Sequence, residues 1–177
     1  MTLNRRTLLA GAIASAAVPL LAACGGGDED HGPGDIVAVA SANSDFSILV
    51  EAVAAAELVD TLQGAGPFTV FAPANAAFAA LLSDLRVTKE DLLKRSDLGD
   101  ILKYHVVSGR VLKADVPVDT DIPTVLGETE TLRISSTFVI TDEAGRTANI
   151  TTTDVLASNG VIHVIDRVIL PSAFAST

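Results

Sequence analysis

The chain has 177 residues, of which 49% are hydrophobic, and its 22 acidic against 12 basic residues give a formal net charge of −10. Such an acidic chain repels the phosphates of nucleic acids and of anionic lipids, which excludes nucleic-acid binding from the expected functions. With no Trp, one Tyr and six Phe, it also offers few aromatic platforms for stacking bases or sugars.

Residues 1–23 have the pattern of an export signal. Arg5 and Arg6 precede an apolar, Ala-rich run that ends in small residues, which is the order of parts in a secretory signal peptide. Pro19 interrupts the run, whereas a transmembrane helix needs about 20 strongly apolar residues. Residues 4–9 read Asn-Arg-Arg-Thr-Leu-Leu and resemble a twin-arginine signal, with general Sec export as the alternative.

Cys24 is the only cysteine and directly follows Leu-Ala-Ala. These four residues resemble the lipobox of bacterial lipoproteins, in which cleavage leaves an N-terminal, lipidated cysteine. A free cysteine is often buried instead, but residues 25–34 are a Gly-rich and acidic stretch that cannot bury it. The sequence therefore predicts that Cys24 is lipidated, and that residues 24–34 form a flexible linker to the membrane of the bacterial cell envelope, on its periplasmic face or at the cell surface.

Residues 35–171 are predicted to form one folded domain, followed by a frayed tail at 172–177. Removal of the signal leaves roughly 150 residues, which is the size of one domain. Because the single cysteine is assigned to the lipid, this domain has no disulfide and depends on apolar packing. We expect it to be a monomer.

The first half of the domain is predicted to be mainly helical. Apolar residues recur at three- and four-residue steps over residues 45–63, and Gly64 then ends the pattern. Asn75 occupies an N-cap position before a short helix that runs to Leu82. Two more helices are predicted, one starting at the N-cap Thr88 and one over residues 98–104.

Strands are predicted mainly in the second half. Residues 68–71 form an apolar run between two prolines, which indicates an early buried strand, and residues 106–107 are extended. Runs rich in β-branched residues predict four later strands, at 131–134, 138–141, 147–152 and 161–170. Helices followed by strands indicate an α+β domain around an antiparallel sheet or sandwich.

Three segments resemble the fasciclin domain family in their order and spacing. Residues 66–78 (Gly-Pro-Phe-Thr-Val-Phe-Ala-Pro-Ala-Asn-Ala-Ala-Phe) resemble its first sequence box, residues 102–107 its Tyr-His segment, and residues 159–171 its second box. Ala74 departs from the pattern, since many members carry Thr there. The resemblance covers residues 35–171 and implies a fasciclin-like fold, a compact sandwich of twisted β-sheets with several helices packed along one side.

Residues able to do chemistry are few. The histidines are His31, in the linker, and His105 and His163, which are far apart in sequence and have no acidic cluster at ligand spacing. A zinc site needs three or four converging ligands, and the chain has neither a Gly-x-Ser-x-Gly nucleophile motif nor a phosphate-binding loop. The sequence therefore predicts a domain that is not an enzyme and that holds no metal or other cofactor.

Tyr104 and His105 are the candidate binding residues. In animal fasciclin domains this region has been tied to integrin binding, so the resemblance implies a surface site at the helix-to-strand junction. Alternatively, both residues are buried struts, because apolar residues surround them in sequence. The two interpretations predict opposite exposure of these side chains.

The resemblance implies a non-catalytic adhesion or interaction module, here anchored by lipid to the cell envelope, with an unidentified protein or polysaccharide as its partner. The alternative is a carrier of a small apolar ligand such as a pigment, since some fasciclin-like proteins hold one. A carrier needs an apolar pocket of about 300 Å³ or more, whereas an interaction module needs only an exposed patch.

Overall fold

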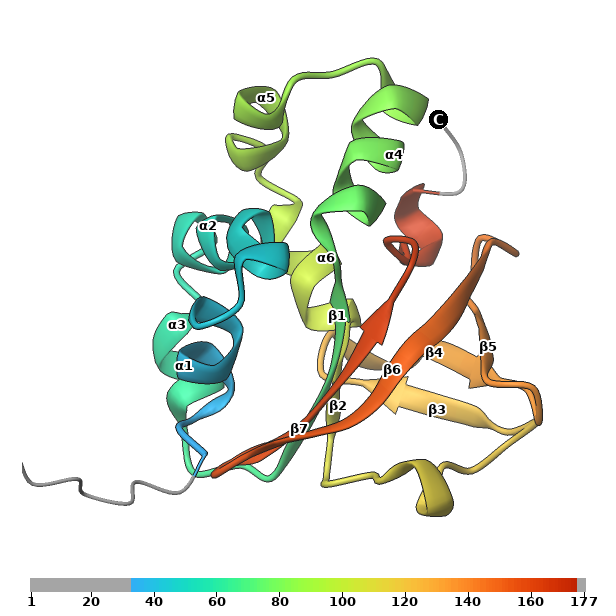
Figure 1. Ribbon diagram of the computed structural model, residues 1–177. Helices are drawn as coiled ribbons and strands as arrows, with labels where there is room; N and C mark the ends of the chain where they lie inside the picture. The colour runs from blue at the N-terminus through green and yellow to red at the C-terminus, as the bar shows by residue number, and fades with distance from the viewer. Residues whose placement is uncertain (1–32, 175–177) are drawn as a thin grey trace, which may run out of the picture. The chain divides into compact units, whose positions relative to one another are not determined.

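The structure is a computed structural model that describes residues 33–174 and places most helices before most strands (Figure 1). Its α-helices are α1 (Ile36–Ser41), α2 (Ser47–Ala55), α3 (Val59–Gln63), α4 (Asn75–Leu85), α5 (Lys89–Leu93) and α6 (Leu98–Tyr104). Its strands are β1 (Phe68–Pro73), β2 (Val106–Ser108), β3 (Asp121–Thr124), β4 (Gly127–Ile134), β5 (Val139–Thr141), β6 (Thr147–Ala157) and β7 (Gly160–Ile165). Short 3₁₀ helices are η1 (Ser44–Phe46), η2 (Lys113–Asp115) and η3 (Ser172–Phe174). The predicted signal peptide, Cys24, His31 and nearly all of the linker lie outside the described residues.

The strands form one sheet in the order β2-β1-β7-β6-β5-β4-β3. All neighbours are antiparallel except β1 and β7, which run parallel. The long strand β6 pairs with β5 over its first residues and with β7 over the rest, and its register shifts on both sides of Thr152. At the far ends of the sheet, Val125 N donates to Val106 O at 2.7 Å, so the sheet nearly closes on itself.

Two apolar cores lie on opposite faces of the central strands. Alternate residues of a strand point to opposite faces, and accordingly Val70 and Ala72 of β1 belong to the core beneath the helices, whereas Phe71 belongs to the core enclosed by the sheet. Figure 1 shows α1, α2 and α3 together on one side of β1. The predicted α+β fold, twisted sheets with helices packed along one side, is confirmed.

The helix predicted over residues 45–63 is interrupted. It consists of η1, α2 and α3, and the break contains Glu57, whose φ of 56° is left-handed and stops the helical hydrogen bonds. Before it lies α1, which was not predicted; Asp35 caps this helix by accepting from Ala38 N at 2.8 Å. The predicted helix over 98–104 is α6.

Asn75 does not have its predicted role. The N-cap of α4 is Ala74, and Asn75 is the first helical residue. Its side chain accepts from Ile48 N at 3.1 Å and donates to Ser44 O at 2.9 Å, so it ties the start of α4 to the start of α2. The predicted cap at Thr88 is confirmed, since its hydroxyl accepts from Asp91 N in a capping box.

The strand predictions differ from the structure at four places. The strand predicted over 131–134 begins earlier, at Gly127, and the one predicted over 147–152 runs on to Ala157. Strand β3 was missed because its Pro123 and flanking polar residues read as a loop; it lies at the edge of the sheet, where proline is tolerated. The strand predicted over 161–170 ends at Ile165. The apolar residues that follow, Val168, Ile169 and Leu170, are buried without being part of the sheet.

Candidate functional site

Tyr104 and His105 lie where α6 ends and β2 begins. Tyr104 is the last residue of α6 and His105 its C-cap. Tyr104 is 0% exposed and His105 is 2% exposed. The phenol ring belongs to the core enclosed by the sheet, whereas the imidazole borders the core beneath the helices. A partner that docks on the surface of this conformation therefore touches neither side chain.

The hydroxyl of Tyr104 joins three parts of the domain. It donates to Thr131 O in β4 at 2.5 Å and accepts from Glu143 N, in the turn after β5, at 3.1 Å. Burial raises the pKa of Tyr104 well above its usual value, so the phenol keeps its proton. These contacts fit the strut interpretation.

The imidazole of His105 also contacts main-chain groups on both sides. Nδ1 lies 2.7 Å from Ile101 O, and Nε2 accepts from Ile169 N at 3.2 Å. These partners assign the proton to Nδ1, because Nε2 must keep its lone pair. Burial lowers the pKa of His105 from 6.5 to about 4, although the hydrogen bond to Ile101 O acts in the other direction and raises it. The ring is therefore neutral around pH 7.

His163 forms a separate site. It is 0% exposed, Nε2 lies 2.9 Å from Val111 O, and Nδ1 accepts from Asp154 N at 3.3 Å. Its ring stacks on Phe71 with centroids 5.7 Å apart. His105 and His163 thus bind different main-chain groups and share no ligand. Within residues 33–174, no three His, Cys, Asp or Glu side chains converge as metal ligands would.

A cluster that sequence reasoning missed holds the segment after β7. Besides the bond from Ile169 N to His105, the buried carboxylate of Asp142 accepts from Leu170 N at 3.0 Å and from Arg146 N at 2.7 Å. Glu130 accepts from the hydroxyl and the N–H of Ser172 at 2.8 and 3.1 Å. We call residues 169–172 the C-terminal strap. In sequence, Asp142 reads only as part of a turn, so nothing there signals its burial.

An apolar crevice lies between helices α1–α3 and the sheet. It contains about 40 Å³ of free space. Its walls come from α1, α2, the α3 region, β1, the end of α6, β2 and β7, and they include Ile36, Ala40, Leu49, Val53, Leu62, Phe68, Val70, Leu102 and Ile162. This volume is well below the roughly 300 Å³ that small-molecule pockets need, so the crevice is closed to such a ligand in this conformation.

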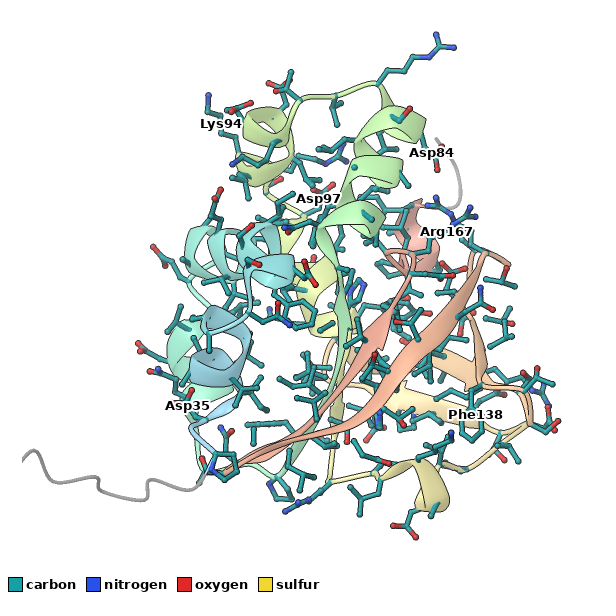
Figure 2. All side chains as sticks on the ribbon, in the orientation of Figure 1. Asp35, Asp84, Lys94, Asp97, Phe138 and Arg167 are labelled. Atoms are coloured by element: carbon teal, nitrogen blue, oxygen red, sulfur yellow. The ribbon has the colours of Figure 1, made fainter. Side chains whose placement is uncertain are left out.

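A second, larger hollow lies beside the C-terminal strap. It measures about 370 Å³ and is lined by charged residues that include Arg95, Asp97 and Glu130. Arg95 bonds to both oxygens of Asp97 at 2.8 and 2.6 Å, and its guanidinium lies 5.5 Å from the centre of the Phe174 ring. Figure 2 labels Asp97 near the helices. Arg95 pairs with Asp97, and Glu130 binds Ser172, so these three charged side chains already have partners within the domain.

The turn between β4 and β5 carries a half-buried aromatic side chain, Phe138. The ammonium of Lys113 lies 4.8 Å from the centre of the Phe138 ring. In the view of Figure 2, Phe138 and Asp35 lie on opposite sides of the domain.

Among residues 33–174, no helix is both long and apolar enough to cross a bilayer.

A family model described as the fasciclin domain matches residues 44–171. "Protein sll1483" of Synechocystis sp. is 47% identical over 139 residues, covering 77% of this chain and 73% of that protein. "Immunogenic protein MPB70" of Mycobacterium bovis is 34% identical over 151 residues, covering 78% of this chain and 70% of that protein. "Transforming growth factor-beta-induced protein ig-h3" of Sus scrofa is 31% identical over 140 residues, but this chain spans 20% of its length.

A solved structure supports the same assignment of the fold. A FAS1 domain pair from the insect cell adhesion molecule Fasciclin I superposes with a TM-score of 0.66 at 20% identity, covering 77% of this chain and 51% of that one. At this level of identity, the likeness concerns the fold.

Proposed function

This chain belongs to the fasciclin domain family, and we propose that it is a non-catalytic interaction or adhesion module of the bacterial cell envelope. In this proposal, lipidated Cys24 holds the domain at the membrane, and the surface of the domain binds a protein or polysaccharide partner. The fasciclin family assignment over residues 44–171 supports an interaction or adhesion role. The similar proteins from Synechocystis and Mycobacterium support a bacterial setting.

The proposal rests mainly on one observation: the buried polar side chains bind main-chain groups of the domain itself. Tyr104, His105, His163 and Asp142 each contact two main-chain groups and are buried. A catalytic acid, base or nucleophile must instead reach the substrate. These four side chains hold the fold together, which leaves the surface for function.

Charge and geometry support anchoring by lipid. Loss of residues 1–23, which contain Arg5 and Arg6 and no acidic residue, changes the formal charge from −10 to −12. A domain this acidic is repelled by anionic headgroups, so it needs a covalent anchor to stay at the membrane. The linker joins the fold at α1, where Ser158 N donates to Gly34 O at 3.0 Å and Ile36 N donates to Asn159 Oδ1 at 3.0 Å.

The anchor is tested by metabolic labelling with radioactive palmitate. The chain with its natural Cys24 should be cleaved and labelled, whereas Cys24→Ser should remain an unlabelled precursor. Cells that carry Cys24→Ser should then adhere no better than cells lacking the chain. Labelling of Cys24→Ser, or full adhesion by cells that carry it, would contradict the proposal.

A second candidate function is the carriage of a small apolar ligand. The apolar crevice beneath α1–α3 favours it, because most of its lining residues are aliphatic. Since the free space is about 40 Å³, a ligand can enter only if the covering helices move outward. The carrier function is separable from adhesion by direct ligand-binding measurements.

A further inference from the structure

The crevice has one charged residue in its wall, and that residue is a cation. Of the described residues that line it, only Lys103 carries a charge at pH 7, while His105 is neutral and Thr61 is uncharged. No acidic residue lines the crevice, although acidic residues outnumber basic ones 22 to 12 in the chain. The local charge is therefore opposite to that of the domain as a whole.

Lys103 is placed to serve both the crevice and the solvent. It lies on α6, its side chain is 41% exposed, and its ammonium is 3.9 Å from Asp100 Oδ1. A lysine at such a boundary lays its methylene stem along apolar surface and keeps its ammonium in water. Asp100 is itself 57% exposed, so this ion pair is weak and can be exchanged for another carboxylate.

Of the two other polar side chains in the wall, Thr61 is exposed to solvent and His105 already has its partners. Both ring nitrogens of His105 contact main-chain groups, at Ile101 and Ile169. The aliphatic wall therefore offers a ligand tail no hydrogen bond, and a polar group buried there would pay its full desolvation. A suitable ligand has a plain hydrocarbon tail and carries its polar group at one end.

We propose that the crevice binds the hydrocarbon tail of a long-chain carboxylate, whose head group meets the ammonium of Lys103 at the edge of the crevice. This inference rests on the carrier function proposed above and names its ligand class. The tail takes its place between α1 and β1 as α1 moves outward. The carboxylate then replaces Asp100 as the partner of Lys103.

Equilibrium dialysis of radiolabelled dodecanoate, well below its micelle concentration, tests the inference. The protein is the full chain with Cys24→Ser, so that no lipid of its own is attached. We expect saturable binding of one dodecanoate per chain and weaker competition by dodecanol, which has the same tail without the charge. Equal competition by dodecanol would overturn the carboxylate inference while leaving the carrier function intact. If neither dodecanoate nor separately labelled dodecanol binds saturably, both the carboxylate inference and the carrier function are overturned.

Substitutions locate the site. Ala40→Leu adds bulk to the wall and should abolish binding, whereas Lys103→Met, which keeps an apolar stem, should weaken dodecanoate binding about two- to fivefold and remove its advantage over dodecanol. Asp100→Asn removes the competing carboxylate and should strengthen binding. The matched control is Lys89→Met, because Lys89 is similarly exposed but pairs with Glu51 away from the crevice.

Thermal melting without ligand checks that each variant is folded. Undiminished binding by a folded Ala40→Leu chain would place the ligand elsewhere and overturn the inference. The same conclusion would follow if Lys103→Met and Lys89→Met behaved alike.

Discussion

Nε2 of His105 accepts a hydrogen bond from the main-chain N–H of Ile169 at 3.2 Å, across 64 positions of sequence. This bond joins the end of α6 to the C-terminal strap, which also binds Asp142 and Glu130. Since the bond uses the lone pair of Nε2, it exists only while the imidazole is neutral. Protonation of His105 therefore weakens the attachment of the strap.

The first prediction concerns pH. Burial lowers the pKa of His105 in the folded chain to about 4, from 6.5, so between these values the unfolded chain binds a proton that the folded chain does not. Stability should thus fall as the pH falls from about 6.5 to about 4, and this contribution should level off below pH 4. The loss is about 3 kcal/mol over that interval. Urea unfolding at a series of pH values measures it.

The control is His105→Gln, whose amide can still donate and accept but does not titrate. It should be less stable than the natural chain at pH 7 and should have a flatter profile between pH 6.5 and 4. All carboxylates are common to both chains, so the difference between the profiles isolates His105. Parallel profiles would show that His105 titrates normally.

The second prediction distinguishes a strut from a binding residue at Tyr104. Tyr104→Phe leaves the ring but deprives Thr131 O and Glu143 N of their partner, which should cost about 1–3 kcal/mol of unfolding free energy. Adhesion per folded molecule should be unchanged, because the side chain is 0% exposed. Loss of adhesion at unchanged stability would instead make Tyr104 a contact residue.

The continuous apolar run of β1 explains why this strand was predictable. Its apolar residues are buried on both faces and lie between prolines, so the pattern leaves few other structures. The end of β7 was less predictable, because Val168, Ile169 and Leu170 continue the same apolar pattern beyond the sheet. Their burial depends on side chains from α6, β4 and the turn after β5, and this long-range information is not present in the local sequence.

The candidate site, too, could be predicted from the sequence only in part. Tyr104 and His105 could be selected from the family resemblance, but their exposure depends on which strands come to cover them. The crevice arises only when helices α1–α3 pack against β1 and β7, so no short motif marks it. Lys103 stands next to the selected pair, yet only the fold places it at an apolar wall.

The third prediction compares two residues of the first sequence box. Phe71 is 3% exposed and stacks on His163, so Phe71→Ala should cost about 3–5 kcal/mol. Asn75→Ala should cost about 1–2 kcal/mol, because it leaves Ile48 N and Ser44 O without their partner. Denaturant unfolding measures both, and a greater loss for Asn75→Ala would contradict this account of the box.

The last prediction concerns two glycines in different surroundings. Gly160 pairs with Phe68 in the parallel β1–β7 ladder. A Cβ atom there would collide with Phe68 O and would lie 2.8 Å from Ile36 Cδ1. The carbonyl belongs to the ladder and cannot move aside cheaply, so Gly160→Ala should cost more than about 2 kcal/mol. At Gly99, on α6, a Cβ atom would meet no other atom within 4 Å, so Gly99→Ala should be neutral or stabilise by up to about 1 kcal/mol. Thermal and urea unfolding of the two variants measure the contrast. Equal effects of the two changes would mean that β1 and β7 are not as closely apposed as the structure has them.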